Sequence, residues 1–417
     1  MRLPSVEGAL EARTRLSSVV LETPFQLLER WSQRLKAAIY IKREDLQQVR
    51  SFKIRGAYNK IVKLTDAERK QGIVCASAGN HAQGFAFSCR DLKIKGTVFM
   101  PLPTPQQKIE QVRMFGGDFV EVRLVGDTYD DSQKAARKFQ KERQSHFIHP
   151  FDDLDVIEGQ ATLALEILDQ AQQALDYLFV PVGGGGLVSG VLTIFKERSP
   201  NTKIIGVEPT GAPSMSKSLE NNKITPLKRI DKFVDGAAVK KVGQLSFEVC
   251  RTHLDDCVLV EEGRVCQEIL DLYNKEGIVA EPAGALALSA LDQYAKAVEG
   301  KQVGVLICGG NNDITRTPEI KERALLFAQL KHYFIVRFPQ RAGALKEFVN
   351  TILGPQDDIT FFEYSKKTNR VNAPAVVGIR LKSANDFEPL VARMKEADFY
   401  GEYLNDNPTC ISFWFSI

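Results

Sequence analysis

The first three quarters of the sequence alternate short apolar runs with amphipathic helical patterns, and this alternation constrains the fold more than any other feature. Four runs have the length and composition of buried parallel strands, at residues 72–76, 96–100, 177–180 and 303–307. A strand–helix–strand order implies doubly wound α/β layers with right-handed crossovers. Ligands on such sheets bind in the loops that leave the carboxyl ends of the strands, so we expect functional motifs there.

Near residue 325 the pattern changes to that of a second domain. Strand-like runs lie at residues 332–338, 359–364 and 375–381. One helical pattern lies between the first two runs and ends at residue 353, and a second covers residues 384–395. This succession fits the β-α-β-β-α-β order of ferredoxin-like α+β domains. We therefore expect one domain over residues 1–322 and a second over residues 323–417.

Composition narrows the class of protein. The 417 residues carry 55 basic and 52 acidic side chains without a basic stripe, so we expect no nucleic-acid partner. No stretch approaches the roughly 20 apolar residues that span a bilayer, and the N-terminus lacks a signal-peptide core. We therefore expect a cytoplasmic protein with no membrane partner. None of the seven cysteines forms a C-x-x-C pair, which argues against a disulfide framework or a zinc site.

The first motif is S-F-K-I-R-G-A, residues 51–57, which opens a helix with Ser51 as its expected N-cap. Lys53 then lies in the first turn, where the helix dipole disfavours a cation and lowers the pKa of the amine. A lowered pKa suits a lysine that forms a Schiff base. The competing interpretation is a solvated surface lysine, and this motif alone does not decide between the two.

The second motif is S-A-G-N-H-A-Q-G, residues 77–84, which follows a strand and opens a helix. Its small residues can present consecutive backbone N–H groups at a helix N-terminus, an arrangement that suits a carboxylate. Asn80 can hydrogen-bond a cofactor oxygen, and Ser77 offers a hydroxyl group. A tight turn that needs Gly79 only for its backbone angle is the alternative.

The third motif consists of four consecutive glycines, residues 183–186, followed by Leu187. Between a buried strand and a helix, such a loop can wrap a phosphate with its N–H groups, aided by the helix dipole. It has no Gly-Lys-Ser/Thr sequence after it and does not fit G-x-G-x-x-G, so neither a P-loop nor a dinucleotide site is predicted. A flexible linker is the alternative.

The fourth motif is C-G-G-N-N, residues 308–312, at the end of a predicted strand. A thiol in this position can hydrogen-bond a pyridine nitrogen without carrying a charge. For Cys308 alone, a buried structural cysteine is the favoured interpretation.

Together with E-P-A-G-A at residues 281–285, these motifs occur in the same order as in the serine/threonine dehydratase group of fold-type II pyridoxal-phosphate enzymes. The resemblance covers residues 20 to 320. It implies two doubly wound α/β subdomains and pyridoxal 5′-phosphate as cofactor. It also implies β-elimination from L-threonine, which yields 2-oxobutanoate and ammonia.

By this resemblance, Lys53 holds the cofactor and removes the α-proton, and Phe52 packs beside it. Asn80 binds the pyridoxal 3′-oxygen, and the neutral Cys308 faces the pyridine nitrogen, which favours elimination over transamination. The phosphate is expected on Gly183, Gly184, Gly185, Gly186 and Leu187. The substrate carboxylate is expected on Ser77, Ala78, Gly79, Asn80 and His81. Ser77 is a second catalytic candidate, and the role of Glu281 is left open.

Some members of this group bind a divalent cation near an acidic loop. The matching positions are Glu208 and the Ala212 carbonyl, but Ser214 stands where those relatives have a second carboxylate. We therefore predict no metal site.

The second domain resembles the ACT-like regulatory domain of biosynthetic threonine dehydratases, in the short form with one copy. The motif F-P-Q-R-A-G-A-L, residues 338–345, carries this resemblance. It implies allosteric regulation by isoleucine, a homotetramer and a place at the first step of isoleucine biosynthesis. A domain that only joins subunits is the alternative.

Other activities remain open at this point. A serine dehydratase or racemase, a catabolic threonine dehydratase and a β-replacement enzyme share the same motifs. A non-catalytic amino-acid sensor is an alternative of another class, although an intact lysine, glycine loop and asparagine argue against it.

Overall fold

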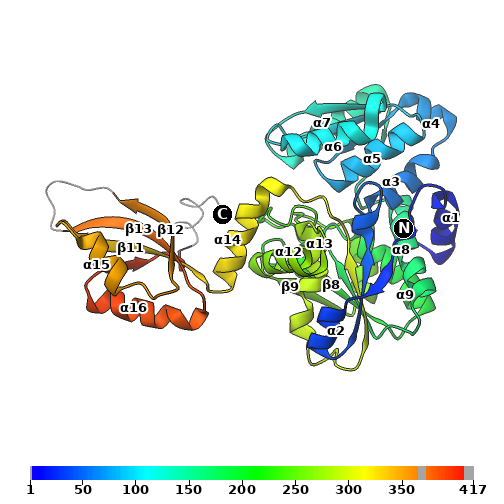
Figure 1. The fold of residues 1–417 in the computed structure, drawn as a ribbon. Helices are drawn as coiled ribbons and strands as arrows, with labels where there is room; N and C mark the ends of the chain where they lie inside the picture. The colour runs from blue at the N-terminus through cyan, green and yellow to red at the C-terminus, as the bar shows by residue number, and fades with distance from the viewer. Residues whose placement is uncertain (1, 365–371, 408–417) are drawn as a thin grey trace. The chain divides into compact units, whose positions relative to one another are not determined.

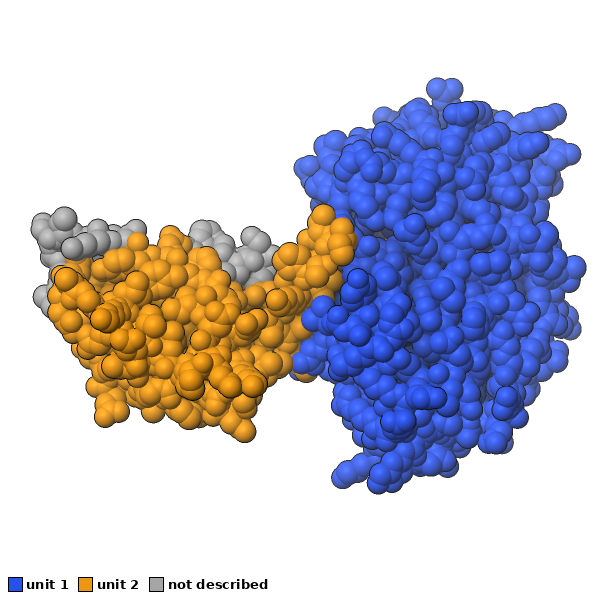
Figure 2. Space-filling model, in the orientation of Figure 1, with its two compact units in different colours: residues 1–313 blue, residues 314–417 orange. Residues whose placement is uncertain are grey.

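The computed structural model describes residues 2–364 and 372–407. The chain forms two compact units, residues 1–313 and 314–417, which are coloured separately in Figure 2. The boundary expected at residues 322 and 323 falls inside helix α14 (Thr317–Phe327), the first long element of unit 2.

Unit 1 is built around two sheets, of which the larger has six strands in the order β1-β2-β10-β7-β8-β9. These strands are β1 (Phe25–Leu27), β2 (Ala38–Arg43), β10 (Gln302–Ile307), β7 (Tyr177–Pro181), β8 (Lys203–Pro209) and β9 (Asp256–Val260). Strand β1 runs antiparallel to β2, and the other neighbours are parallel. Strand β10 therefore lies between β2 and β7, and its carboxyl end brings Cys308 to the same edge of the sheet as the glycine loop.

The smaller sheet has four parallel strands in the order β5-β4-β3-β6. Its strands are β3 (Ile73–Ala76), β4 (Gly96–Met100), β5 (Val120–Leu124) and β6 (His146–Phe147). In Figure 1 it forms a separate cyan lobe together with α4 (Asp66–Gln71), α5 (Asn80–Asp91), α6 (Gln106–Gly116) and α7 (Tyr129–Arg143). Both sheets are covered by helices, which confirms the expected α/β class.

The other helices of unit 1 are α1 (Val6–Leu16), α2 (Glu29–Leu35), α3 (Lys53–Val62), α8 (Leu154–Gln170), α9 (Gly186–Arg198), α10 (Ser214–Glu220), α11 (Gln244–His253), α12 (Glu262–Glu276) and α13 (Pro282–Ser289). Helices α3 and α8 approach each other through glycines. A Cβ on Gly56 would lie 2.6 Å from the Val156 carbonyl oxygen, and one on Gly159 would lie 2.6 Å from the Arg55 carbonyl oxygen. This close crossing fixes the start of α3, where Lys53 lies.

Unit 2 has the expected β-α-β-β-α-β order. Its elements are β11 (Lys331–Pro339), α15 (Ala344–Thr351), β12 (Asp358–Tyr364), β13 (Asn372–Arg380), α16 (Phe387–Glu396) and β14 (Tyr400–Tyr403). They form a sheet in the order β12-β13-β11-β14 with antiparallel neighbours. Phe334, Phe348, Leu390 and Phe399 fill its core. The prediction of a ferredoxin-like second domain is confirmed.

Within the described residues, none of the helices combines the length and the apolar character that a membrane-spanning segment requires.

Candidate active site

The first and fourth motifs lie against each other. The backbone N–H of Phe52 donates to the Cys308 carbonyl at 3.1 Å, and Ser51 forms a β-bridge with Gly309. Because this bridge holds Ser51 in extended backbone, the helical turn begins only at Phe52, which occupies the N-cap position of α3. The Ser51 hydroxyl is buried, and no hydrogen-bond partner for it lies within residues 2–364 and 372–407. The prediction that Ser51 caps this helix is therefore wrong, whereas Lys53 does lie in its first turn.

Lys53 is a cation with few partners. Its Nζ donates to the Pro150 carbonyl at 3.0 Å and lies 5.1 Å from the centre of the Phe52 ring. Burial lowers the pKa of this amine to about 8, although the nearby Cys308 and Glu281 raise it. Burial, more than the helix dipole invoked from the sequence, is the cause. A measurable fraction of the amine is therefore unprotonated near neutral pH, as a nucleophile or base requires.

The glycine loop is a cradle with no room for side chains. A Cβ on Gly184 would lie 2.3 Å from the ring of Phe151, and one on Gly185 would lie 2.6 Å from the Ser246 Cβ. Gly185 has a φ of 92° and forms the N-cap of α9. The first backbone N–H groups of α9 have no partner within the helix and lie next to the glycine loop. The Ser246 hydroxyl beside it is buried and has no hydrogen-bond partner among the residues that the structure describes. An anion such as a phosphate would satisfy both the helix N-terminus and this hydroxyl.

Asn80 opens helix α5 and belongs to a chain of polar groups. Its Nδ2 donates to Glu281 Oε1 at 2.5 Å, and its Oδ1 accepts from Asn311 Nδ2 at 2.8 Å. Burial and the nearby Asp235 raise the pKa of Glu281 to about 7. The structure thus joins the second motif to E-P-A-G-A and to C-G-G-N-N.

The rest of the second motif folds partly on itself. The Ser77 hydroxyl accepts the backbone N–H of Gly79 at 3.2 Å, so this N–H already has a partner. His81 is buried, and its Nε2 donates to the Ile148 carbonyl at 3.0 Å. Burial and the nearby Lys53 lower the pKa of His81 to about 3, so the ring is neutral. The imidazole therefore packs inside the protein as an uncharged ring.

Cys308 is a neutral thiol in this site. It is buried, and its Sγ donates to the Ala283 carbonyl at 3.3 Å. Burial raises the pKa of the thiol well above its ordinary value. Cys308 therefore contributes a polar group without a charge, as the sequence argument required.

Glu208 is held by backbone groups. Its two carboxylate oxygens accept from the N–H groups of Met215 at 2.7 Å and Ser216 at 2.8 Å. The Ala212 carbonyl accepts the N–H of Ser214 at 2.9 Å. In the part of the chain that the structure describes, no group of three or more His, Cys, Asp or Glu side chains has the arrangement of a metal site.

Sequence reasoning missed the segment around Pro150 and the hydroxyl of Ser246. The Pro150 carbonyl accepts from Lys53, and Phe151 lies against the glycine loop. The Asp152 carboxylate accepts the N–H groups of Gln244 and Leu245, each at 2.9 Å, and so caps the helix that carries Ser246. In the sequence, only an aspartate near a helix start hinted at the cap formed by Asp152. Neither Pro150 nor Ser246 belongs to a recognisable motif.

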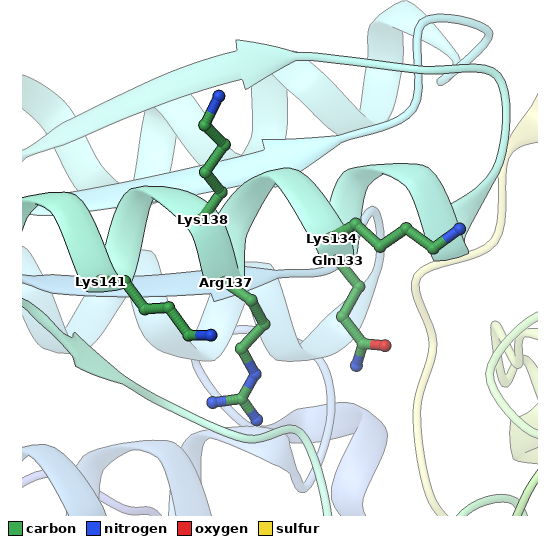
Figure 3. A pocket seen from close by; sticks show the side chains of 5 residues that line it. All are labelled: Gln133, Lys134, Arg137, Lys138 and Lys141. Atoms are coloured by element: carbon green, nitrogen blue, oxygen red, sulfur yellow. The ribbon is translucent and has the colours of Figure 1, made fainter.

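A hollow on helix α7, shown in Figure 3, lies outside these motifs. It is lined by Gln133, Lys134, Arg137, Lys138 and Lys141. All five side chains come from one helix, its four cations are exposed, and in Figure 3 Lys138 points to the opposite side of the helix from Arg137 and Lys141. This is a solvated helix face, and it provides no group that converges on a ligand.

Comparison with known sequences agrees with the two units. Residues 16–309 match the family described as "Pyridoxal-phosphate dependent enzyme", and residues 322–413 match the "C-terminal regulatory domain of Threonine dehydratase". A protein of Halalkalibacterium halodurans called L-threonine dehydratase biosynthetic IlvA is 51% identical over 96% of this chain and 97% of its own length. The protein of the same name from Bacillus subtilis is 53% identical over 95% of this chain and 94% of its own length.

Solved structures show the same fold. The processed form of threonine deaminase isoform 2 from Solanum lycopersicum superposes with a TM-score of 0.73 at 38% identity, over 78% of this chain and 91% of that one. Maize serine racemase superposes with a TM-score of 0.72 at 28% identity, over 78% of this chain and 98% of that one.

Proposed function

Because the chain belongs to the pyridoxal-phosphate-dependent enzymes and, within them, to the biosynthetic threonine dehydratases, we propose that the residues gathered around Lys53 form its catalytic site. The chain is a lyase that converts L-threonine to 2-oxobutanoate and ammonia. The observation that carries the site assignment is the partner-poor Lys53 beside a glycine cradle with an unpaired hydroxyl. We also propose that this reaction is the first step of isoleucine biosynthesis.

The residues fit pyridoxal 5′-phosphate at both ends. Lys53 would hold it through Nζ, with Phe52 beside it, and Asn80 would donate to its 3′-oxygen. Cys308 would lie at the pyridine nitrogen as a neutral group. The phosphate would be held by Gly183, Gly184, Gly185, Gly186 and Leu187. We add Ser246, because none of the described residues forms a hydrogen bond with its buried hydroxyl.

When bound, the cofactor supplies an electron sink for the pair of electrons left behind as the α-proton departs. Lys53 takes that proton at Nζ, since its pKa of about 8 leaves part of the amine unprotonated near neutral pH. The substrate carboxylate would lie on the backbone of Ser77, Ala78, Gly79, Asn80 and His81. The Ser77 hydroxyl also stabilises this turn by accepting from the Gly79 N–H. We propose Ser77 as the second catalytic residue.

Unit 2 would bind the effector. Gly343 has a φ of 85° and forms the N-cap of α15, so the turn after β11 exposes backbone N–H groups next to Arg341. We propose that this turn takes the carboxylate of isoleucine. The division into a catalytic domain over residues 1–322 and a regulatory domain over residues 323–417, the homotetramer and the cytoplasmic location are part of the same proposal.

An absorbance spectrum of the holoenzyme tests the function. A band near roughly 410 nm should change on addition of L-threonine while 2-oxobutanoate accumulates, and isoleucine should then slow product formation. A band with product from L-serine and none from L-threonine would overturn the substrate assignment. The absence of any band with cofactor supplied would overturn the role of Lys53.

A further inference from the structure

Glu281 is a buried carboxylate whose place in the site is not explained by the roles assigned above. Its exposed fraction is 4%, and a Cβ on Gly309 would lie 2.4 Å from its Oε1. Among the described residues, no lysine or arginine forms an ion pair with it. Its hydrogen bonds come from amides, namely the Asn80 side chain and the Asn311 backbone. Burial of a carboxylate on amide donors alone is costly, which indicates that the site needs this group.

The partner that Glu281 holds most closely is the side chain of Asn80. The Asn80 amide is fixed from both ends, since Nδ2 donates to Glu281 and Oδ1 accepts from Asn311. Asn311 is itself held by donating to the Val49 carbonyl at 2.9 Å. An amide fixed in this way cannot exchange the positions of its oxygen and nitrogen. An amide nitrogen has two N–H groups, so one remains for a ligand after Glu281 has taken the other.

We propose that Glu281 is a positioning residue that fixes the Asn80 amide so that its second N–H faces the cofactor. The inference rests on the proposed function, because it takes Asn80 to be a cofactor contact. Glu281 acts through Asn80 and does not touch the reacting atoms itself. Removing it should therefore weaken cofactor binding by the same mechanism as removing Asn80.

The charges around Glu281 predict how this contact depends on pH. Lys53 from α3 and Cys308 at the end of β10 face it, together with Asp235 and Lys108, which form an ion pair with each other. Burial and Asp235 raise the pKa of Glu281 to about 7, although Asn80 and Lys108 lower it. Below that pH the carboxyl group gains a proton and becomes a poorer acceptor for Asn80. Cofactor affinity should therefore fall as the pH falls through about 7.

The test is a titration of the apoenzyme with pyridoxal 5′-phosphate, followed by absorbance. Glu281→Ala should raise the Kd by about tenfold to a hundredfold, the range expected for loss of one hydrogen bond to a charged group. Glu281→Gln keeps one acceptor oxygen and should cause a smaller loss. The matched control is Glu268→Gln, a buried carboxylate of α12 that binds Arg30 and Arg264 outside the site. Its Kd should stay within about twofold of wild type.

A double-mutant cycle separates positioning from mere structural support. In an Asn80→Ala background, Glu281→Gln should change the Kd by less than about twofold, because the residue through which it acts is absent. The part of the fall in affinity that is centred near pH 7 should also disappear in Glu281→Gln, whereas the part set by protonation of the Lys53 amine, whose pKa is about 8, should remain. Equal losses in both backgrounds, or an unchanged pH profile, would overturn the inference. Failure of the wild-type holoenzyme to make 2-oxobutanoate would instead overturn the proposed function, and the two outcomes are read from different measurements.

Discussion

Helix α3 carries two cations two residues apart, the half-buried Lys53 and the buried Arg55, and their surroundings are opposite. In the described part of the chain, Lys53 has a single hydrogen-bond partner, a carbonyl oxygen, and burial lowers its pKa to about 8. Arg55 is 1% exposed and binds two carboxylates in bidentate fashion, Glu44 at 2.8 Å and Glu166 at 2.6 and 2.9 Å. The Arg55 pKa is raised by these partners, so this residue does not titrate.

The difference shows how one helix can serve both chemistry and stability. A cation saturated with carboxylates is locked in one protonation state and one position. A cation deprived of partners is destabilised as an ion and can lose its proton. The Arg55 cluster, with Lys42 also donating to Glu166 at 2.6 Å, anchors the helix that presents Lys53.

The largest expected effect is on catalysis. Lys53→Ala should lower kcat/KM for L-threonine by about 10⁴-fold or more, because both the cofactor link and the base are lost. The free energy of unfolding of the apoenzyme should stay within about 1 kcal/mol of wild type or rise, since a half-buried cation with no carboxylate partner among the described residues is removed. Product formation and urea unfolding measure the two effects. A large loss of stability would mean that Lys53 stabilises the fold as Arg55 does, and would contradict the division of roles between the two residues.

The next largest effect is on stability. Arg55→Met should lower the free energy of unfolding by about 3–5 kcal/mol, because Glu44 loses its guanidinium partner and Glu166 keeps only Lys42. The control is Arg13→Met, which breaks an exposed ion pair with Asp169 and should cost less than about 1 kcal/mol. Equal effects in the two variants would show that the buried cluster is no stronger than a surface pair.

A smaller effect appears in the dependence of stability on pH. The folded pKa of Lys53, about 8, lies below the unfolded value of about 10.4. Between these values the unfolded chain binds the extra proton, so stability should rise with pH there. The difference in unfolding free energy between wild-type and Lys53→Ala apoenzymes should shift in favour of wild type by at most about 1.4 kcal/mol per pH unit. A difference that stays flat from pH 8 to 10 would refute the lowered pKa.

The smallest expected effect belongs to the neutral neighbour of Lys53. Cys308→Ser keeps an uncharged donor for the Ala283 carbonyl and should change kcat/KM by less than about threefold. Cys308→Asp should lower it far more, because a carboxylate would give Lys53 an ionic partner like those of Arg55. If the aspartate variant were as active as the serine variant, the absence of a charged partner at Lys53 would have no catalytic value.

Local patterns in the sequence were enough to predict the fold class and to choose the motifs. Buried strands, glycine-rich turns and helix starts depend on neighbouring residues, so the runs before residues 77, 183 and 308 could be recognised. The family resemblance assigned roles to Lys53, Asn80 and Cys308. In the structure Asn80 donates to Glu281, and Glu281 and Cys308 both lie close enough to Lys53 to interact with it electrostatically.

The rest depended on contacts between distant segments. Asn80 and Glu281 are 201 residues apart, and Ser51 was mistaken for a cap because its bridge to Gly309 could not be foreseen. Arg55 was taken as part of a motif, while its partners Glu44 and Glu166 come from elements with no motif of their own. Burial set the pKa of Lys53, and burial is a property of the packed chain.

Strand β10 is the last strand of unit 1 in the chain, yet it occupies an inner position of the sheet between β2 and β7. During synthesis, strands β1 and β2 therefore cannot pair with the rest of the sheet until about residue 307 has left the ribosome. Until then the edge of β7 that will receive β10 is open, and nascent chains are exposed to association with one another. Chaperone demand for this enzyme should thus be concentrated in the interval between translation of β2 and translation of β10.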